Sequence, residues 1–202
     1  LSTLYPAEVW VKLGLIDSNG IPTQRGLIFS FFSKGEGLAV AVALEDVNYP
    51  IEELVYDLAN LRAGHRFRAY AKYESRLALV CREAFGFKNC PGYLKNGLPV
   101  EYGDGADEAL RHWEESPLSS SEFSEDVSTG DIERVAIEWR SILSLISQAP
   151  PLDFVRWQSL QKAARILVGE NSGNEELPEL PELPFRQQER YQSSSKDTFR
   201  VN

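Results

Sequence analysis

The region between residues 130 and 148 carries the pattern that most restricts how this chain can fold. Its apolar side chains recur at spacings of three and four residues, and they are Ile132, Val135, Ala136, Trp139, Ile142, Leu143 and Ile146. This period places them along one face of an α-helix, and such a face is normally buried against other elements. The pattern therefore predicts a long amphipathic helix that packs into a core.

Seven further segments have helical signals, whereas few residues favour strands. Thr23 is a good N-cap for the helix that follows it, and Gly14, Gly86 and Gly169 are suitable helix stops. The predicted helices cover residues 6–14, 24–32, 36–44, 51–61, 67–85, 106–113 and 153–168. The third of these is rich in Ala and Val, so we expect it to be buried. The predicted fold class is mainly α.

The sequence suggests three regions along the chain. Residues 1–34 predict a helix, a small β-wing after the turn at 17–20, and a second helix. Residues 35–170 predict a helical bundle, in which seven Gly and Pro residues between 86 and 106 indicate a loop. Residues 171–202 form a tail of different composition.

The tail repeats Glu-Leu-Pro three times between residues 176 and 184. Proline at every third position excludes a helix and favours an extended, polyproline-like conformation. We expect a tail that is flexible or lies along a partner. A spacer is the simplest interpretation, and the alternative is a docking motif that presents Leu177, Leu180, Leu183 and Phe185.

The net charge and the hydropathy pattern limit the class of protein. The 202 residues carry a formal charge of -9, which argues against a free-standing nucleic-acid binder but leaves room for a local basic stripe. No stretch approaches the roughly 20 apolar residues of a membrane span, and the chain does not begin with a signal peptide. We therefore expect a cytoplasmic protein without a membrane partner.

The sequence offers no catalytic or metal-binding pattern. There is no phosphate loop, no dinucleotide-binding glycine motif and no nucleophile elbow. The two histidines, His65 and His112, do not have metal-ligand spacing. Cys81 falls among core-facing positions and is predicted to be a reduced structural thiol, with a disulfide to Cys90 as the alternative. We expect this chain to have no catalytic residue, metal or cofactor of its own.

Basic residues at helical spacing are the candidates for nucleic-acid contact. Arg134 lies near the start of the helix 130–148, where it can reach a phosphate, and a salt bridge with Glu138 is the alternative. Arg68, Lys72 and Arg76 are spaced by four residues in the predicted helix 67–85. Such a row suits a phosphate backbone, and pairing with the acidic, Ser-rich connector at 114–126 is equally compatible with it. Trp139 and Trp157 are expected to be core residues rather than base-stacking platforms.

Several motifs resemble, in order, those of a known helicase family. Leu13-Gly14-Leu15-Ile16, a turn, and Thr23-Gln24-Arg25-Gly26 resemble the end of the winged-helix domain in superkiller-type DExH helicases. The segment 53–67 resembles the first helices of the helical domain that follows. Leu110 to Pro117 resembles a helix that ends in Trp before a Pro-containing step, and Ser128 to Val135 resembles a Glu-Gly-x-Ile-x-Arg helix start.

The remaining helices complete the resemblance, which spans roughly residues 4–170. Residues 139–146 and 152–168 are similar to the rest of this domain, which is called the DSHCT type. The family's helix that matches Arg134 is described as a ratchet beside the translocating strand. One departure is Glu138, which stands where the family tends to have a second basic residue.

This resemblance implies a non-catalytic C-terminal accessory domain of an ATP-dependent RNA or DNA helicase. Such a domain lines the path of the single strand and braces the RecA-like motor domains, which bind ATP and Mg²⁺. Arg134, Arg68, Lys72 and Arg76 would contact phosphates. Two alternatives stay open: an interaction module that binds a protein partner through the acidic connector and residues 175–202, and a free-standing winged-helix regulator.

Overall fold

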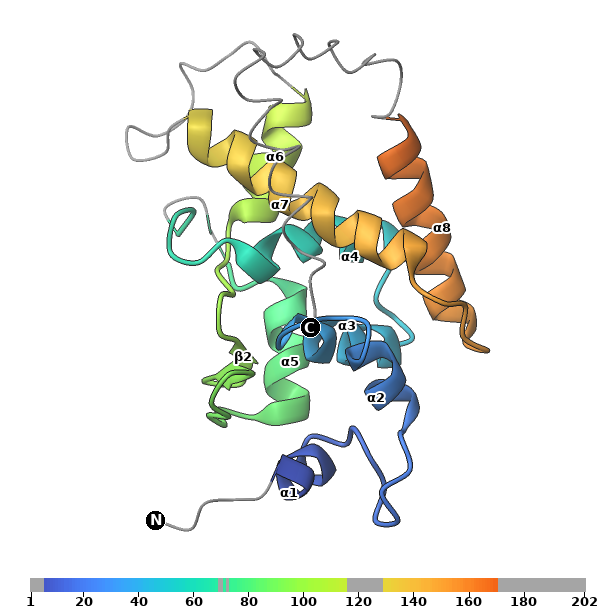
Figure 1. Ribbon diagram of the computed structural model, residues 1–202. Helices are drawn as coiled ribbons and strands as arrows, with labels where there is room; N and C mark the ends of the chain where they lie inside the picture. The colour runs from blue at the N-terminus through green and yellow to red at the C-terminus, as the bar shows by residue number, and fades with distance from the viewer. Residues whose placement is uncertain (1–5, 69–70, 72, 116–128, 171–202) are drawn as a thin grey trace, which may run out of the picture. The chain divides into compact units, whose positions relative to one another are not determined.

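The computed structural model describes residues 6–68, 71, 73–115 and 129–170, and this part is mainly helical, as the sequence predicts (Figure 1). Residues 1–170 form one unit and residues 171–202 a second. The predictions for the tail, and for most of the acidic connector, therefore concern residues outside the described part. Within the described ranges, every helix is too short or too polar to cross a membrane.

Two short helices open the unit. Helices α1 (Pro6–Lys12) and α2 (Gln24–Phe29) are joined by the predicted turn, in which Asp17 Oδ1 accepts two backbone hydrogen bonds. A single β-bridge stands where a small β-wing was expected. Thr23 caps α2 as predicted, because its Oγ1 accepts a hydrogen bond from the N–H of Gly26 at 3.1 Å.

The core runs without interruption from these helices into the rest of the unit. Leu13, Ile28 and Phe32 belong to the same cluster of buried side chains as residues from the predicted bundle. The expected boundary between residues 34 and 35 is therefore not a boundary between separate cores.

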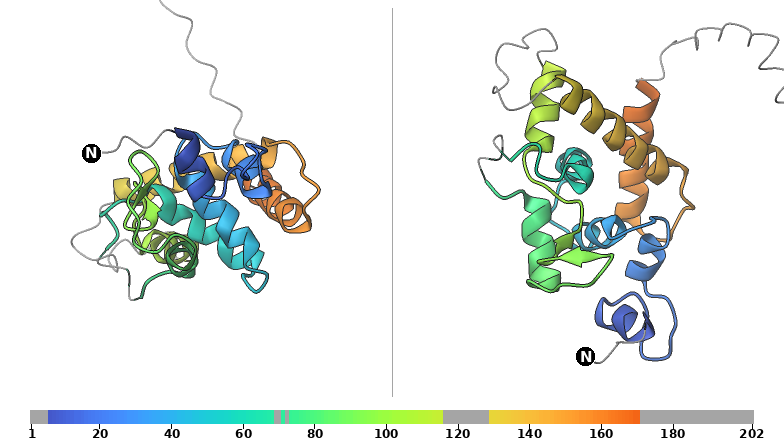
Figure 2. Two further views of the ribbon diagram at one scale, coloured as in Figure 1. Left: turned by 90° about the horizontal axis from the view of Figure 1, so that it is seen from below. Right: turned by 60° about the vertical axis from the view of Figure 1, so that its left-hand side comes forward.

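Helix α3 (Glu36–Glu45) lies at the centre of this core. Every residue from Glu36 to Leu44 is buried, as the Ala and Val content of the segment predicts. Helices α2 and α5 (Arg76–Phe85) pack against it (Figure 2). A helix that is apolar on all sides is stable only when it is covered on all sides. The other elements are accordingly arranged around α3.

Helix α4 (Ile51–Asp57) continues into the 3₁₀-helix η1 (Leu58–Arg62), which matches the predicted helix at 51–61. The buried side chain of Asn60 reaches from η1 to helix α6 (Ala106–Glu115). Its Oδ1 accepts hydrogen bonds from the first two N–H groups of α6 at 3.0 and 3.2 Å, and its Nδ2 donates to Asp107 at 2.8 Å. A distant side chain thus supplies the N-cap of α6.

The prediction of one helix over residues 67–85 is wrong in its first half. Helix α5 begins only after Ser75, whose Oγ accepts a hydrogen bond from an N–H in the first turn of α5 at 3.2 Å. The N–H of Ser75 donates to Asp104 Oδ1 at 3.1 Å, and Phe67 is fully buried. Burial of Phe67 and capping by Ser75 outweigh the helical propensity of the preceding residues.

The segment predicted as a Gly- and Pro-rich loop contains a β-hairpin. Strands β1 (Leu94–Lys95) and β2 (Leu98–Pro99) pair in antiparallel register around Asn96 and Gly97. Both turn residues have positive φ, 52° and 78°, which is the conformation of a two-residue type I′ turn. The hairpin packs against α3 and α5.

Helices α7 (Thr129–Gln148) and α8 (Val155–Glu170) pack against each other (Figures 1 and 2). Helix α7 also contacts η1 and α6, and α8 contacts α4. Trp139 and Trp157 are buried, which confirms that they are core residues. The indole Nε1 of Trp139 donates to the carbonyl oxygen of Val55 at 2.7 Å and so joins α7 to α4.

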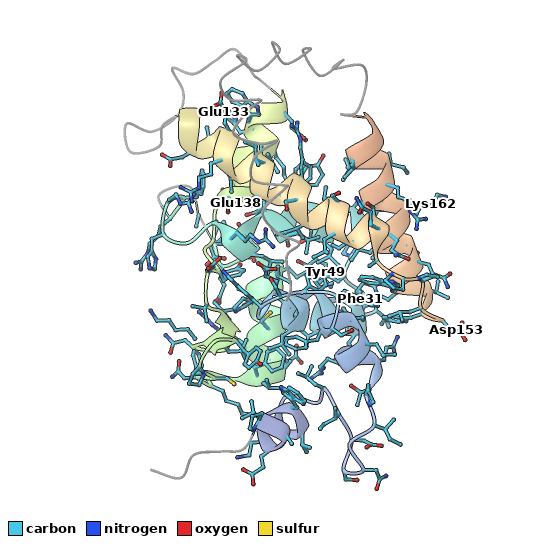
Figure 3. All side chains as sticks on the ribbon, viewed as in Figure 1. Phe31, Tyr49, Glu133, Glu138, Asp153 and Lys162 are labelled. Carbon is cyan, nitrogen blue, oxygen red and sulfur yellow. The ribbon has the colours of Figure 1, made fainter. Side chains whose placement is uncertain are left out.

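Arg156 ties α8 to the end of α3. Its guanidinium donates to the carbonyl oxygens of Leu44, Val47 and Tyr49 at 3.0, 3.3 and 2.6 Å. These carbonyls close the last turn of α3 and the turn that follows it, where backbone acceptors have no helical partner. Elsewhere on α8, exposed Lys162 projects away from the body (Figure 3).

Replacing Asn60 with Ala should lower the free energy of unfolding by about 2 kcal/mol. The change leaves the first two N–H groups of α6 without their acceptor in a buried position. Urea denaturation followed by circular dichroism measures the loss. Asn48→Ala removes an exposed amide of the same type and should change stability by less than about 0.5 kcal/mol. Equal effects of the two substitutions would contradict the capping role of Asn60.

Candidate nucleic-acid interface

Two of the predicted phosphate-contacting residues, Arg134 and Arg76, form ion pairs in the described part of the chain, and Arg134 is the more exposed of the two. It lies in the first turns of α7, and 65% of its side chain is exposed. Its Nε donates to Glu138 Oε1 at 3.0 Å, so the alternative of an i, i+4 salt bridge is confirmed. Figure 3 labels Glu138 on α7. Exposed helix pairs of this kind contribute only about 0.3–0.5 kcal/mol, so a phosphate can compete with Glu138 for Arg134.

Glu138 also belongs to a charged surface, the charged seam, which consists of Lys34, Glu36, Arg62, Glu101, Arg134 and Glu138. Arg62 donates to both carboxylate oxygens of the buried Glu36, at 2.6 and 3.0 Å. These hydrogen bonds raise the pKa of Arg62, and the charges of Glu138 and Glu101 act in the same direction. Three cations face three carboxylates here, so the seam has no net charge.

Arg76 is held inside the fold rather than on a basic row. Its Nη2 donates to Asp46 at 2.9 Å, its Nη1 lies 3.8 Å from Glu53, and its guanidinium lies 4.7 Å from the ring centre of Tyr49. The hydrogen bond from Arg76 lowers the pKa of Asp46. Arg76 thus links α5 to the end of α3 and to α4.

The helix face that was expected to carry the basic row is not formed. Arg68 lies in a turn, Arg76 lies in α5, and Lys72 lies outside the described residues. Arg68 instead lines a polar cavity of about 550 Å³ together with His65, Tyr73, Glu74, Arg82 and Asp104. Within the described part of the chain, no hydrogen bond or ion pair engages the Arg68 side chain.

The walls of this cavity are held by their own hydrogen bonds. The Tyr102 hydroxyl donates to Asp104 Oδ1 at 2.7 Å and lies 2.5 Å from Ser75 Oγ. Burial, together with the charge of Asp104, raises the pKa of Tyr102 well above its ordinary value. Arg82 forms an ion pair with Glu74, while its Nε is buried without a hydrogen-bond partner. These contacts fix the side chains that border the cavity before any ligand arrives.

A buried Asp–Tyr pair beneath α6 was not anticipated from the sequence. The Tyr49 hydroxyl donates to the carboxylate of Asp57, and both side chains are buried. Burial is the main cause that raises the pKa of Asp57 to about 7, and the charges of Asp107 and Glu53 act in the same direction. The hydrogen bond from Tyr49 and the charge of Arg111 act in the opposite direction. Only the position of Asp57 near the end of an amphipathic helix was visible in the sequence, and that position does not reveal its burial.

A second cavity, of about 350 Å³, is an apolar groove between α1 and α2. It is lined mainly by Trp10, Leu15, Ile16, Pro22, Leu27 and Phe29. Trp10 and Leu27 are partly exposed. A groove of this composition suits an apolar segment of a protein partner rather than a charged ligand.

The described residues contain no cluster of three His, Cys, Asp or Glu side chains that could hold a metal ion. Cys81 is buried, Cys90 is partly buried, and the two are not bonded to each other, in agreement with structural thiols. Burial raises the pKa of Cys81 to about 12, so its thiol stays protonated and unreactive near neutral pH.

The free energy of unfolding of the wild-type chain should fall as the pH rises, and the Asp57→Asn variant should not show this fall. The folded protein keeps a proton on Asp57 up to a pKa of about 7, whereas the unfolded chain releases it near 3.8. The free energy of unfolding should therefore fall between about pH 4 and pH 7, by up to about 1.4 kcal/mol per pH unit. The Asn amide oxygen still accepts the hydrogen bond from Tyr49.

Urea denaturation across this pH range measures the difference between the wild type and the Asp57→Asn variant. Asp153→Asn changes an exposed carboxylate and should follow the wild-type curve. Parallel curves for the wild type and Asp57→Asn would show that Asp57 does not carry the buried proton.

Comparison of the chain with protein-family models gives no match. Comparisons with curated proteins and with solved structures give no match either. The resemblance to DExH helicases therefore rests on the order of the sequence motifs and on the residues within them.

Proposed function

We propose that this chain is a non-catalytic C-terminal accessory domain of an ATP-dependent RNA or DNA helicase. It lines the path of the single strand and braces the RecA-like motor domains, which bind ATP and Mg²⁺. Support comes from the order of motifs across residues 4–170 and from the mainly helical fold. The observation that carries the proposal is the position of Arg134, which is exposed in the first turns of α7 and whose partner among the described residues is Glu138, in a surface salt bridge.

The four basic residues have different parts in this proposal. Arg134 contacts a backbone phosphate by exchanging Glu138 for it, and Arg68 provides a second contact from the rim of the polar cavity. Arg76 acts as an internal brace, since Asp46 and Glu53 already neutralise it. Lys72 keeps its proposed contact, although it lies outside the described residues.

The charged seam keeps the proposed strand contact weak. Glu138 competes with phosphate for Arg134, and the net charge of -9 repels a polyanion at long range. Most of the affinity then comes from the motor domains, and this domain guides the strand rather than anchoring it. A weak contact of this kind is suited to a strand that must slide.

A protein-interaction module is the second candidate. Its sequence basis, the acidic connector and residues 175–202, lies almost entirely outside the described residues. The apolar groove between α1 and α2 favours it, because partly exposed Trp10 and Leu27 border a cavity with few polar atoms. Deleting the chain after Gly169 separates the tail from the groove: a partner that still binds the shortened chain would exclude the tail as its docking site.

Arg134→Ala should weaken binding of a fluorescent single-stranded oligonucleotide about tenfold, since it removes one charge-assisted phosphate contact. Glu138→Gln should strengthen binding, because it releases Arg134 from its competitor. The salt dependence of log Kobs should decrease in slope by about 0.7 for Arg134→Ala. Fluorescence anisotropy at several salt concentrations measures all three quantities.

Arg140→Ala is the matched control for this experiment. Arg140 is exposed on the same helix but points to a different face, so its substitution removes the same charge without touching the proposed contact. If Arg134→Ala and Arg140→Ala weaken binding equally, only net charge matters and Arg134 has no specific role. Thermal denaturation of each variant establishes that the fold is retained.

A further inference from the structure

The polar cavity has the size and the wall chemistry of a small-ligand site. Its volume of about 550 Å³ falls in the range of roughly 300–1,000 Å³ that is usual for such sites. The wall combines cationic, anionic, aromatic and apolar side chains, which come from described residues between 64 and 68, at 71 and at 73–74, and from α5 and the hairpin region. A ligand that satisfies all of them needs an anionic group, a flat ring and hydroxyl donors.

Two basic side chains at the cavity can hold an anion. Arg68 and His65 are both exposed, and neither side chain forms a hydrogen bond or ion pair with another described residue. A guanidinium presents a fork of N–H donors that matches the oxygens of a phosphate. Arg82, by contrast, is already paired with Glu74, so the free positive charge of the cavity belongs to Arg68.

An aromatic side chain lines the same cavity. Tyr73 lines the cavity and is 84% exposed, so its ring is accessible to a ligand. Leu98 and the ring of Tyr102 contribute buried apolar surface to the same cavity. An exposed aromatic ring of this kind is suited to stacking on a nucleobase, and each stacked base commonly contributes enough binding energy to be measured by alanine substitution.

Two carboxylate oxygens of the cavity, Asp104 Oδ2 and Glu74 Oε2, accept no hydrogen bond from a described residue. All described hydrogen bonds to Asp104 go to Oδ1, and the ion pair of Glu74 uses Oε1. The other oxygens, Oδ2 and Oε2, repel a phosphate but readily accept hydrogen bonds from sugar hydroxyls. The 2′-hydroxyl is the group that distinguishes RNA from DNA at a protein site.

From this juxtaposition we infer that the polar cavity binds one ribonucleotide. Its phosphate lies against Arg68 and His65, its base stacks on Tyr73, and its ribose hydroxyls donate to Asp104 and Glu74. The ribonucleotide is either free or part of an RNA strand, and only the second case rests on the proposed helicase function. In that case the cavity makes RNA, rather than DNA, the preferred strand.

Isothermal titration of the intact chain with mononucleotides tests the inference. AMP should bind saturably, and dAMP and adenosine should each bind about tenfold more weakly, because each lacks one of the recognised groups. Arg68→Ala should sharply reduce the preference for AMP over adenosine, because only His65 then remains beside the phosphate, and Tyr73→Ala should weaken the binding of both ligands to the same extent. Both side chains are exposed, so neither substitution disturbs the core.

Controls separate this site from the proposed strand contact on α7. Arg134→Ala and Arg140→Ala should leave the affinity for AMP unchanged, whatever their effect on oligonucleotides. Displacement of AMP by an adenine ribo-oligomer, but not by the matching deoxyribo-oligomer, assigns the cavity to an RNA strand, and absence of displacement assigns it to a free ribonucleotide. Absence of saturable AMP binding, equal affinity for AMP and dAMP, or an unchanged AMP preference in Arg68→Ala would each overturn the inference.

Discussion

The burial of α3 on every side is the constraint on which the rest of this structure depends. A helix without a polar face has to be enclosed, and α2, α5 and the hairpin pack directly against it. Its one buried charge, at Glu36, is compensated by two hydrogen bonds from Arg62. At its other end, Arg156 of α8 donates to the carbonyls that close the helix. The ends of α3 therefore determine where two arginines of distant elements must lie.

This constraint also explains why a count of basic residues overstates the surface that is open to nucleic acid. Three arginines are already bound to acceptors within the fold, and these contacts join helices to one another. They are Arg62 and Arg76, which bind carboxylates, and Arg156, which binds backbone carbonyls. Arg134 and Arg68 are the predicted contacts that keep a donor for a ligand, one on α7 and one at the polar cavity. The acidic total and the proposed binding of a polyanion are thus compatible, because the contact depends on a few placed cations rather than on a basic surface.

The sequence predicts best where the signal is local. The period of three and four residues located α7, and Thr23 was recognised as the cap of α2. The hairpin also had a local signal, since Asn96-Gly97 is the favoured pair for a two-residue turn, but the surrounding Gly and Pro residues obscured it. No local sequence signal marks the late start of α5 or the polar cavity, because both depend on side chains that come together only in the folded chain. The motif-based helicase assignment concerns function and stays a proposal.

The link between Arg156 and α3 has a consequence for how the protein is made. The carbonyl oxygen of Leu44 accepts a hydrogen bond from Arg156, which is synthesised 112 residues later in the chain. At a synthesis rate of about 5–20 residues per second, that delay is roughly 5 to 20 seconds. During this interval α4 also lacks its contacts with α8 and the hydrogen bond from Trp139 of α7. The end of α3 and one face of α4 therefore acquire their full set of native contacts only after α8 has been made.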